Sequence, residues 1–267
     1  MTRIGFLGVG HLAEEMITGL LRSGLSASEM ILSPRGHGPK LAERHGIALA
    51  GDNGSLVAEA DIVLLATRPG DAVAAVMGLG WRPGQILVSA CAGVPLADLR
   101  AAAAPADVVR IMPLTAASIG ASPTTVYPDL PALRPLLARL GAVIPLADEA
   151  GFETATVSAA IYGWAQVLIG LGRDWSLAHG LAPETARQLA AETFVAAGRM
   201  IAERPEPVEA LLTSLATPGG ITECGLKVLE AGDVEASWIA ASDAVLEKLT
   251  GAPAGAAGRE ELSPPPT

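Results

Sequence analysis

The sequence predicts an α/β fold in which a doubly wound parallel sheet at the amino terminus precedes an all-helical second domain. Two observations support this fold class. Short apolar runs alternate with amphipathic segments through the first half of the chain, and the order strand, helix, strand, helix favours a parallel sheet with helices on both faces. From about Asp148 the strand signals vanish, and long Ala- and Leu-rich segments with helical spacing follow.

Five segments of the first half read as strands. Each is a brief β-branched or Leu-rich run, as expected for a strand that is covered on both faces. They run from Arg3 to Leu7, Met30 to Leu32, Asp61 to Ala66, Gln85 to Ala90 and Val108 to Met112.

Helical patterns lie between and after these runs. The segment from His11 to Ser23 carries apolar residues at helical spacing and is followed by Gly24, which predicts a C-terminal stop. Leu96 to Ala104 and Leu133 to Leu140 read in the same way.

The second half is interrupted at three places, which are His179-Gly180, Arg204 to Pro207, and Pro218-Gly219-Gly220. Pro183 is expected in the first turn of a helix, where proline costs little, and Ala186 to Ala202 continues it. We therefore predict a dinucleotide-binding domain over residues 1–147, a helical domain over 148–250, and a disordered tail over 251–267 outside the fold.

Composition excludes several classes of protein. The 267 residues are 50% apolar and 17% charged, which indicates a globular chain. A net charge of −10, only 3% aromatic residues and the lack of a basic cluster argue against a nucleic-acid partner. Cys91 and Cys224 make no disulfide framework, so we expect a reducing cytoplasm, and the spacing of the four histidines predicts no metal site.

An uncharged stretch of 19 residues runs from Thr154 to Gly172, close to the roughly 20 residues of a membrane-spanning helix. It contains polar side chains and three glycines, and no Lys or Arg anchors flank it. We therefore expect a helix that is buried by protein and not by lipid. Because a helical domain of about 100 residues has few ways to bury such a segment alone, the sequence predicts a homodimer or higher homo-oligomer.

The strongest local motif follows the first strand. Gly8, Gly10 and Ala13 form Gly-x-Gly-x-x-Ala, with His11 and Leu12 inside it, at the opening of a helix. In a Rossmann-type site, the first glycine permits a tight turn, the second lets backbone N–H groups approach a pyrophosphate, and the small third residue lets helix and strand pack closely. The motif predicts a dinucleotide whose pyrophosphate lies at the helix N-terminus.

The end of the second strand suggests which dinucleotide binds. NAD-specific sites place an Asp or Glu there for the ribose 2′-OH, but this chain has Ser33-Pro34-Arg35. A hydroxyl and a guanidinium can bind a 2′-phosphate, so we favour NADP, with NAD still possible. The alternative, that Arg35 is a solvated loop residue, stays open.

Two further loops follow strand ends that should face the cofactor. They are Ala66-Thr67-Arg68-Pro69 and Ala90-Cys91-Ala92-Gly93. Their small residues would let the backbone approach the nicotinamide half of the ligand, although turns of this kind also occur for packing alone.

In this order, the residues resemble the pyrroline-5-carboxylate reductase family. The resemblance runs from Arg3 to about Lys248 and rests on five blocks: Gly8 to Glu14, Asp52-Asn53, Ala66 to Pro69, Val108 to Pro113, and Thr217-Pro218-Gly219-Gly220-Ile221-Thr222. It implies a Rossmann domain, a helical domain that interleaves with a partner subunit, and NAD(P)H-dependent reduction of a cyclic imine carboxylate in proline biosynthesis. Asn53 would then join the cofactor site.

The same resemblance assigns the substrate residues. The turn that contains Thr217, Gly219 and Gly220 would hold the substrate carboxylate at a helix N-terminus, and the hydroxyl of Thr222 would reach the imine nitrogen. Hydride delivery to such a carbon needs alignment and a proton donor rather than a strong nucleophile.

The chain departs from the family where it would touch the substrate. Leu114 and Ala116 stand where members usually carry Asn and Pro, and Ser158 to Trp164 replaces Ser-Gly-Ser-Gly-Pro-Ala-Tyr. Ala159, Ile161 and Tyr162 add bulk there, so the substrate could be a different imine or a keto acid.

Two other readings remain open. One is a ketone or hydroxy-acid dehydrogenase on the same plan, with Lys227 as the proton-transfer residue. The other is a non-catalytic NADP-binding regulatory dimer whose pocket is filled by Leu114, Ile161 and Tyr162. Glu223, beside Thr222, could orient a substrate amine, but a first-turn glutamate is also favoured by the helix dipole.

Overall fold

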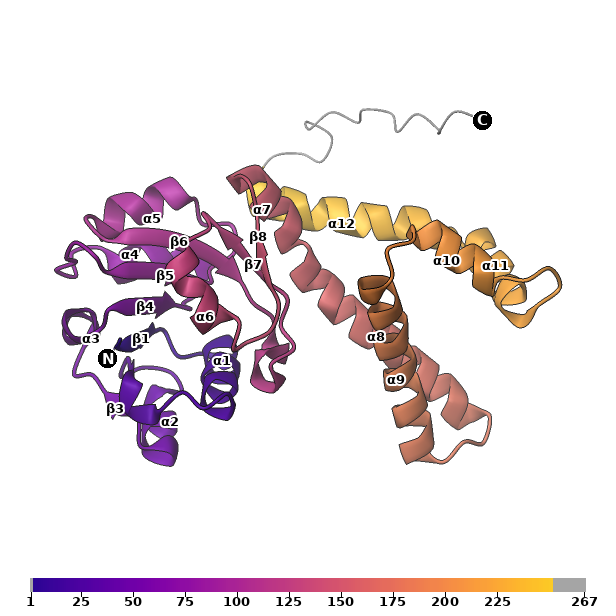
Figure 1. The fold of residues 1–267 in the computed structure, drawn as a ribbon, viewed down its shortest axis with the longest axis horizontal. Helices are drawn as coiled ribbons and strands as arrows, with labels where there is room; N and C mark the ends of the chain where they lie inside the picture. Colours follow the sequence, from indigo (N-terminus) through magenta and orange to yellow (C-terminus); the bar gives the residue numbers. More distant parts are fainter. Residues whose placement is uncertain (1, 252–267) are drawn as a thin grey trace. The chain divides into compact units, whose positions relative to one another are not determined.

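The computed structural model describes residues 2–251 (Figure 1). The chain divides into two compact units. The sheet unit contains the residues up to Ala159 together with the end of the last helix from Leu246, and the helical unit runs from Ala160 to Val245. The sequence placed its domain boundary after residue 147, whereas the contacts place the division at Ala160. From residue 252 onward, the predicted tail lies outside the described residues.

One sheet organises the first unit. Its eight strands lie in the order β3-β2-β1-β4-β5-β6-β7-β8. Their bounds are β1 Ile4–Leu7, β2 Met30–Leu32, β3 Ala48–Leu49, β4 Ile62–Leu65, β5 Ile86–Ser89, β6 Asp107–Met112, β7 Thr124–Tyr127 and β8 Val143–Pro145. Because β1 pairs with both β2 and β4, the chain changes direction across the sheet at β1, where a ligand crevice is expected.

All neighbouring strands are parallel except β6 and β7. The antiparallel pair puts Ile111 opposite Val126. Only a short connection containing the 3-10 helix η3, Thr115–Ile119, joins the two strands, and a parallel crossover needs a dozen or more residues. The sheet is therefore mostly parallel, which refines the predicted all-parallel arrangement.

Helices cover both faces of the sheet. In the sheet unit they are α1 His11–Arg22, α2 Gly38–His45, α3 Asn53–Glu59, α4 Ala72–Val76, α5 Leu96–Ala103, α6 Arg134–Leu137 and α7 Glu149–Thr156, with short 3-10 helices η1 Ala27–Glu29, η2 Pro69–Asp71 and η4 Pro131–Leu133. Alternate residues of each strand serve opposite faces. Phe6 and Leu64 belong to the core beneath α1, whereas Leu7 and Leu65 belong to the core beneath α3, α4 and α5.

The predicted fold class is confirmed, and the five predicted strands are present with ends that differ by at most one residue. The predicted helix from Leu133 to Leu140 is shorter than expected. It is the 3-10 helix η4 followed by α6, which ends at Leu137, because Arg139 and Leu140 donate to carbonyls only three residues back.

The helical unit contains α9 Pro183–Glu203, α10 Val208–Leu215 and α11 Ile221–Ala231, together with most of α8 Ser158–Ala178 and of α12 Val234–Thr250. Pro183 opens α9, as expected. Trp164 of α8 and Trp238 of α12 form an edge-to-face pair with ring centroids 5.4 Å apart.

Among the described residues, one helical stretch, Glu149–Ala178, is long and apolar enough to cross a membrane by length and composition. Only 11% of its most apolar window is buried within the chain. The expected burial of this segment by protein is therefore not met inside a single chain. Val167, Leu171 and Trp175, spaced four residues apart, are all at least 60% exposed.

Candidate functional site

A cavity of about 520 Å³ lies at the carboxyl edge of β1, β2 and β4. It is the crevice that the change of direction at β1 predicts. Five of the residues predicted to bind the cofactor line it: Gly8, Ser33, Arg35, Asn53 and Thr67. The structure therefore brings together residues from four separate loops.

Gly8 makes the turn that opens this cavity. Its φ of +87° is a conformation that favours glycine, and an added Cβ would lie 2.6 Å from Thr67 Cγ2. Its backbone N–H donates to Ser33 Oγ at 3.1 Å. The hydroxyl of Ser33, buried in the cavity wall, thus ties the first turn to the end of β2.

Gly10 precedes α1 and leaves its N-terminus open. Among the described residues, no side chain caps this helix, and a Cβ added at Gly10 would meet no atom within 4 Å. Ala13 is fully buried beneath the helix, whereas His11 is exposed, with its Nδ1 3.9 Å from Glu15 Oε1. Open N–H groups at a helix N-terminus suit an anion.

Arg35 is exposed at the mouth of the cavity, and within residues 2–251 its guanidinium forms no ion pair. It also lines a neighbouring cavity of about 490 Å³ with Asp52. Asp52 caps α3, because its Oδ1 accepts from Ser55 N–H at 2.7 Å, and this bond lowers the pKa of Asp52. That carboxylate is therefore held by the helix and not by Arg35.

The loop that carries Arg35 is tied to α1 by contacts that sequence reasoning missed. His37 Nδ1 lies 2.6 Å from Glu14 Oε2, and His37 N–H donates to Val9 O at 2.7 Å. Gly36 has a φ of +65°, and an added Cβ would lie 2.4 Å from Val9 O. Since these pairs join residues more than twenty positions apart, no local pattern could have revealed them.

Of the predicted loop from Ala66 to Pro69, only Thr67 lines the cavity. The neighbouring Ala66 is half-buried. Arg68 and Pro69 are exposed, and neither lines the cavity. Asp71, which also lines it, is a carboxylate that sequence reasoning did not single out.

Ala90, Ala92 and Gly93, in the loop after β5, do not line this cavity. The loop reaches it indirectly, because Cys91 Sγ lies 3.4 Å from Thr67 O. Burial raises the pKa of the Cys91 thiol, which keeps it protonated. Gly93, with φ +66°, lies against Leu249 at the end of α12, so that an added Cβ would be 3.1 Å from Leu249 O.

The residues predicted to hold the substrate form the turn before α11. Gly219 has a φ of +74°, and a Cβ on Gly220 would lie 2.7 Å from Thr217 Oγ1, so both positions suit glycine. Thr222 lies half-buried in the first turn. The structure places this turn in the helical unit and the cofactor residues in the sheet unit.

The carboxylate of Glu223 accepts a hydrogen bond from a backbone N–H that was predicted to bind the substrate carboxylate. Gly219 N–H donates to Glu223 Oε2 at 2.8 Å, and Lys227 Nζ lies 3.1 Å from Glu223 Oε1. The Gly219 bond, followed by that with Lys227, lowers the pKa of Glu223. Lys227, the alternative proton-transfer residue, is therefore paired with a carboxylate.

Leu114, one of the residues that depart from the family pattern, is buried in the sheet unit, and its N–H donates to Ser122 Oγ at 2.8 Å.

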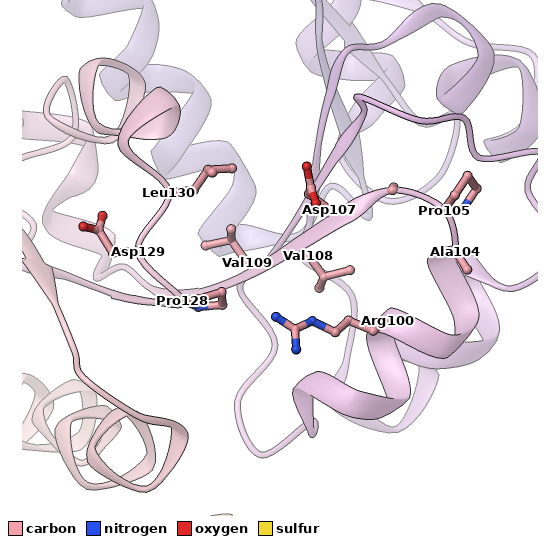
Figure 2. Close-up of a pocket in the computed structure, with 10 residues that line it drawn as sticks. Arg100, Ala104, Pro105, Asp107, Val108, Val109, Pro128, Asp129 and Leu130 are labelled. Carbon is pink, nitrogen blue, oxygen red and sulfur yellow. The ribbon is translucent and has the colours of Figure 1, made fainter.

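A further cavity of about 350 Å³ lies at the amino end of β6, between Arg100, Asp107 and Pro128 (Figure 2). No predicted site residue lines it, and it lies away from the carboxyl ends of the strands where a cofactor is expected.

The chain matches known proteins along most of its length. Residues 152–251 match the family model described as pyrroline-5-carboxylate reductase dimerisation, and residues 3–93 match the model described as NADP oxidoreductase, coenzyme F420-dependent. Pyrroline-5-carboxylate reductase from Pseudomonas aeruginosa is 33% identical over 248 residues, covering 88% of this chain and 90% of that protein. The chain belongs to the pyrroline-5-carboxylate reductase family. A second relative, pyrroline-5-carboxylate reductase 2 of Bacillus subtilis, is 28% identical and covers 86% of this chain and 87% of its own.

Solved structures of pyrroline-5-carboxylate reductases share the fold. The enzyme from Streptococcus pyogenes superposes with a TM-score of 0.82 at 23% identity, over 94% of this chain and 98% of that one. The Plasmodium falciparum enzyme, solved with NADP bound, superposes with a TM-score of 0.79 at 20% identity, over 94% of this chain and 97% of that one. The predicted family and the predicted NADP-dependent oxidoreductase class are confirmed.

Proposed function

We propose that this protein uses NADPH to reduce the C=N bond of a cyclic imine carboxylate of the pyrroline-5-carboxylate type. Membership of the family supports this reaction. The observation that carries it in the structure is the cavity at the change of strand direction, lined by Gly8, Ser33, Arg35, Asn53 and Thr67.

The residues around this cavity fit NADP. The open N-terminus of α1 at Gly10 suits the pyrophosphate, and the guanidinium of Arg35, which has no ion-pair partner within residues 2–251, suits a 2′-phosphate. The cofactor supplies a hydride when it is bound. No carboxylate follows β2 directly to select the 2′-OH of NAD.

The turn before α11 would hold the substrate. Gly219 leaves room for a carboxylate at the helix N-terminus, and the hydroxyl of Thr222 would donate a hydrogen bond to the imine nitrogen. Glu223 must release Gly219 N–H before a substrate carboxylate can take that donor.

A substrate screen tests the proposal. NADPH oxidation should depend on added pyrroline-5-carboxylate, and turnover should be slower with keto acids. Thr222→Ala should lower kcat by about ten- to a thousandfold, the effect of losing one positioned proton donor, while NADPH affinity stays unchanged. Turnover with keto acids alone would contradict the imine substrate, and a fully active Thr222→Ala variant would remove Thr222 from this role.

We further propose that the protein acts as a homodimer in the cytoplasm. The exposed apolar residues of α8 and the match of residues 152–251 to a dimerisation model support this assembly. A second copy, rather than lipid, would cover Glu149–Ala178. The cytoplasmic location is supported by the cysteine content, since only Cys91 and Cys224 occur and they form no disulfide framework.

A further inference from the structure

Arg110 is the largest side chain that is fully buried in the protein. It lies on β6, where its Nη1 atom is 2.7 Å from Glu149 Oε1 and 2.6 Å from Glu153 Oε1. Its guanidinium also stacks over the ring of Phe152 at 4.6 Å. We call Arg110, Glu149 and Glu153 the Arg110 cluster. A buried charge is costly unless it is paired, so this cluster requires an explanation.

The geometry of the cluster is not the one that maximises ion pairing. Both carboxylates converge on the single atom Nη1, while Arg110 Nε and Nη2 and Glu153 Oε2 are buried without a partner in the part of the chain that the structure describes. A guanidinium that only neutralised a carboxylate would present two parallel N–H groups to it. Nη1 instead fixes the position of one oxygen of Glu149 and one oxygen of Glu153.

That position is set by a second contact. Glu149 Oε1 also accepts from Leu96 N–H at 2.7 Å. Leu96 is the first residue of α5, which has no side-chain cap of its own because Pro95 precedes it. Glu149, from α7, thus caps the helix that ends the loop after β5.

The beginning of this loop is held by the sheet and by Ser89. Arg110 lies in register with Ser89, the last residue of β5, and Ser89 Oγ accepts from Cys91 N–H at 3.3 Å. Cys91 Sγ in turn lies 3.4 Å from Thr67 O, and Thr67 lines the cofactor cavity. The loop from Ala90 to Pro95 is therefore held by the sheet at Ser89 and by Glu149 at Leu96, and Cys91, near its beginning, contacts Thr67 in the wall of the cavity.

We propose that Glu149, oriented by Arg110, is a positioning residue for the cofactor. It holds the loop from Ala90 to Pro95, and through Cys91 the side of the cavity formed by Thr67, in the conformation that NADPH requires. This inference rests on the proposed function, because it assumes that NADPH occupies the cavity. Glu149 touches neither substrate nor cofactor in this scheme.

The matched variants are Glu149→Ala and Glu153→Ala. Each removes one carboxylate from Arg110 and leaves the other, but only Glu149 touches Leu96. Both should lower the melting temperature. Glu149→Ala alone should weaken NADPH binding about tenfold in a fluorescence titration, the effect of losing one charge-assisted contact. Glu149→Gln, whose amide oxygen can still accept from Leu96 N–H, should recover part of that affinity.

A second readout separates positioning from stability. With 4-deuterated NADPH, the primary isotope effect on kcat should rise in Glu149→Ala, because a misplaced cofactor makes hydride transfer slower relative to the other steps. It should stay at the parent value in Glu153→Ala. Equal NADPH affinities and isotope effects in the two variants would overturn the inference, as would a Glu149→Ala variant that matches the parent.

Should Glu149→Ala not fold, Glu149→Gln gives the decisive titration, and loss of affinity in Glu153→Ala equal to that in Glu149→Gln would overturn the inference. The parent protein keeps the two proposals apart. A parent that fails to bind NADPH contradicts the proposed function, whereas a parent that binds and turns over normally beside unaffected Glu149 variants contradicts only the positioning role.

Discussion

At the residue scale, Arg35 and Glu223 are the charged side chains whose surroundings say most about ligands. Arg35 is a cation at a cavity with no ion-pair partner among the described residues. Glu223 is an anion that already occupies a backbone donor. The surroundings of Arg35 therefore lead to a prediction about the 2′-phosphate of the cofactor, and those of Glu223 to a prediction about the carboxylate of the substrate.

Arg35→Ala should weaken NADPH binding about ten- to a hundredfold and leave NADH binding unchanged, because only NADPH carries the 2′-phosphate. Parallel fluorescence titrations with the two nucleotides measure this. Lys40→Ala, another exposed cation that follows β2, is the control and should leave both affinities unchanged. Equal losses of affinity for the two nucleotides would show that Arg35 does not bind the 2′-phosphate.

Glu223→Gln should lower the KM for the imine carboxylate several-fold at a nearly constant kcat, because the variant removes a negative charge from the donor that the substrate needs. Steady-state kinetics measure this, with Glu230→Gln on the same helix as the control. Because the pKa of Glu223 lies below its usual value, its carboxylate stays ionised throughout neutral pH and loses its charge only as the pH falls through the lowered value. The difference in KM should therefore be constant across neutral pH, and a higher KM in Glu223→Gln would contradict the competition.

At the scale of the element, the outcome for each strand follows from its length and its buried side chains. The strands β1, β2, β4, β5 and β6 were predictable because each contains a run of buried apolar residues. The edge strand β3 was missed because it has only two residues. In β7, Thr124 and Thr125 are buried polar residues, and Thr124 pairs with Ser122, so the segment lacks an apolar run.

Some features of the candidate site were also predictable from the sequence, and others were not. A glycine with positive φ, such as Gly8, leaves a local signature because few other residues adopt that conformation. The contacts of His37 with Glu14 and of Glu149 with Leu96 leave none, since their partners come from other elements. Turns were therefore predictable, and the side chains that hold those turns together were not.

Gly10, which precedes α1, and Gly19, in the third turn of α1, make a matched pair of variants. A Cβ on Gly19 would lie 2.0 Å from the backbone oxygen of Ala117 in η3, so Gly19→Ala should destabilise the fold by about 1–3 kcal/mol. A Cβ on Gly10 would touch nothing, so Gly10→Ala should keep the melting temperature and weaken NADPH binding. Thermal melts and titrations of both variants measure this, and a stable Gly19→Ala variant would contradict the close helix contact.

At the scale of the whole molecule, α8 exposes a row of apolar side chains that we expect a second copy to bury, namely Val167, Leu171 and Trp175. We expect a dimer in sedimentation experiments at micromolar concentration, and Leu171→Glu should shift it toward monomer by placing a charge in an apolar interface. Gln166→Glu, which adds the same charge at an exposed polar position on α8, should leave the dimer intact. A parent protein that sediments as a stable monomer would refute the proposed assembly.

The approach of Leu249 to Gly93 has a consequence for biosynthesis. The end of α12, from Leu246, belongs to the sheet unit, so that unit lacks these contacts while those residues are still inside the ribosome. During that interval, the apolar helices of the second unit are already emerging. The nascent chain therefore passes through a stage at which neither unit is finished, and at that stage chaperones have the most apolar surface to protect.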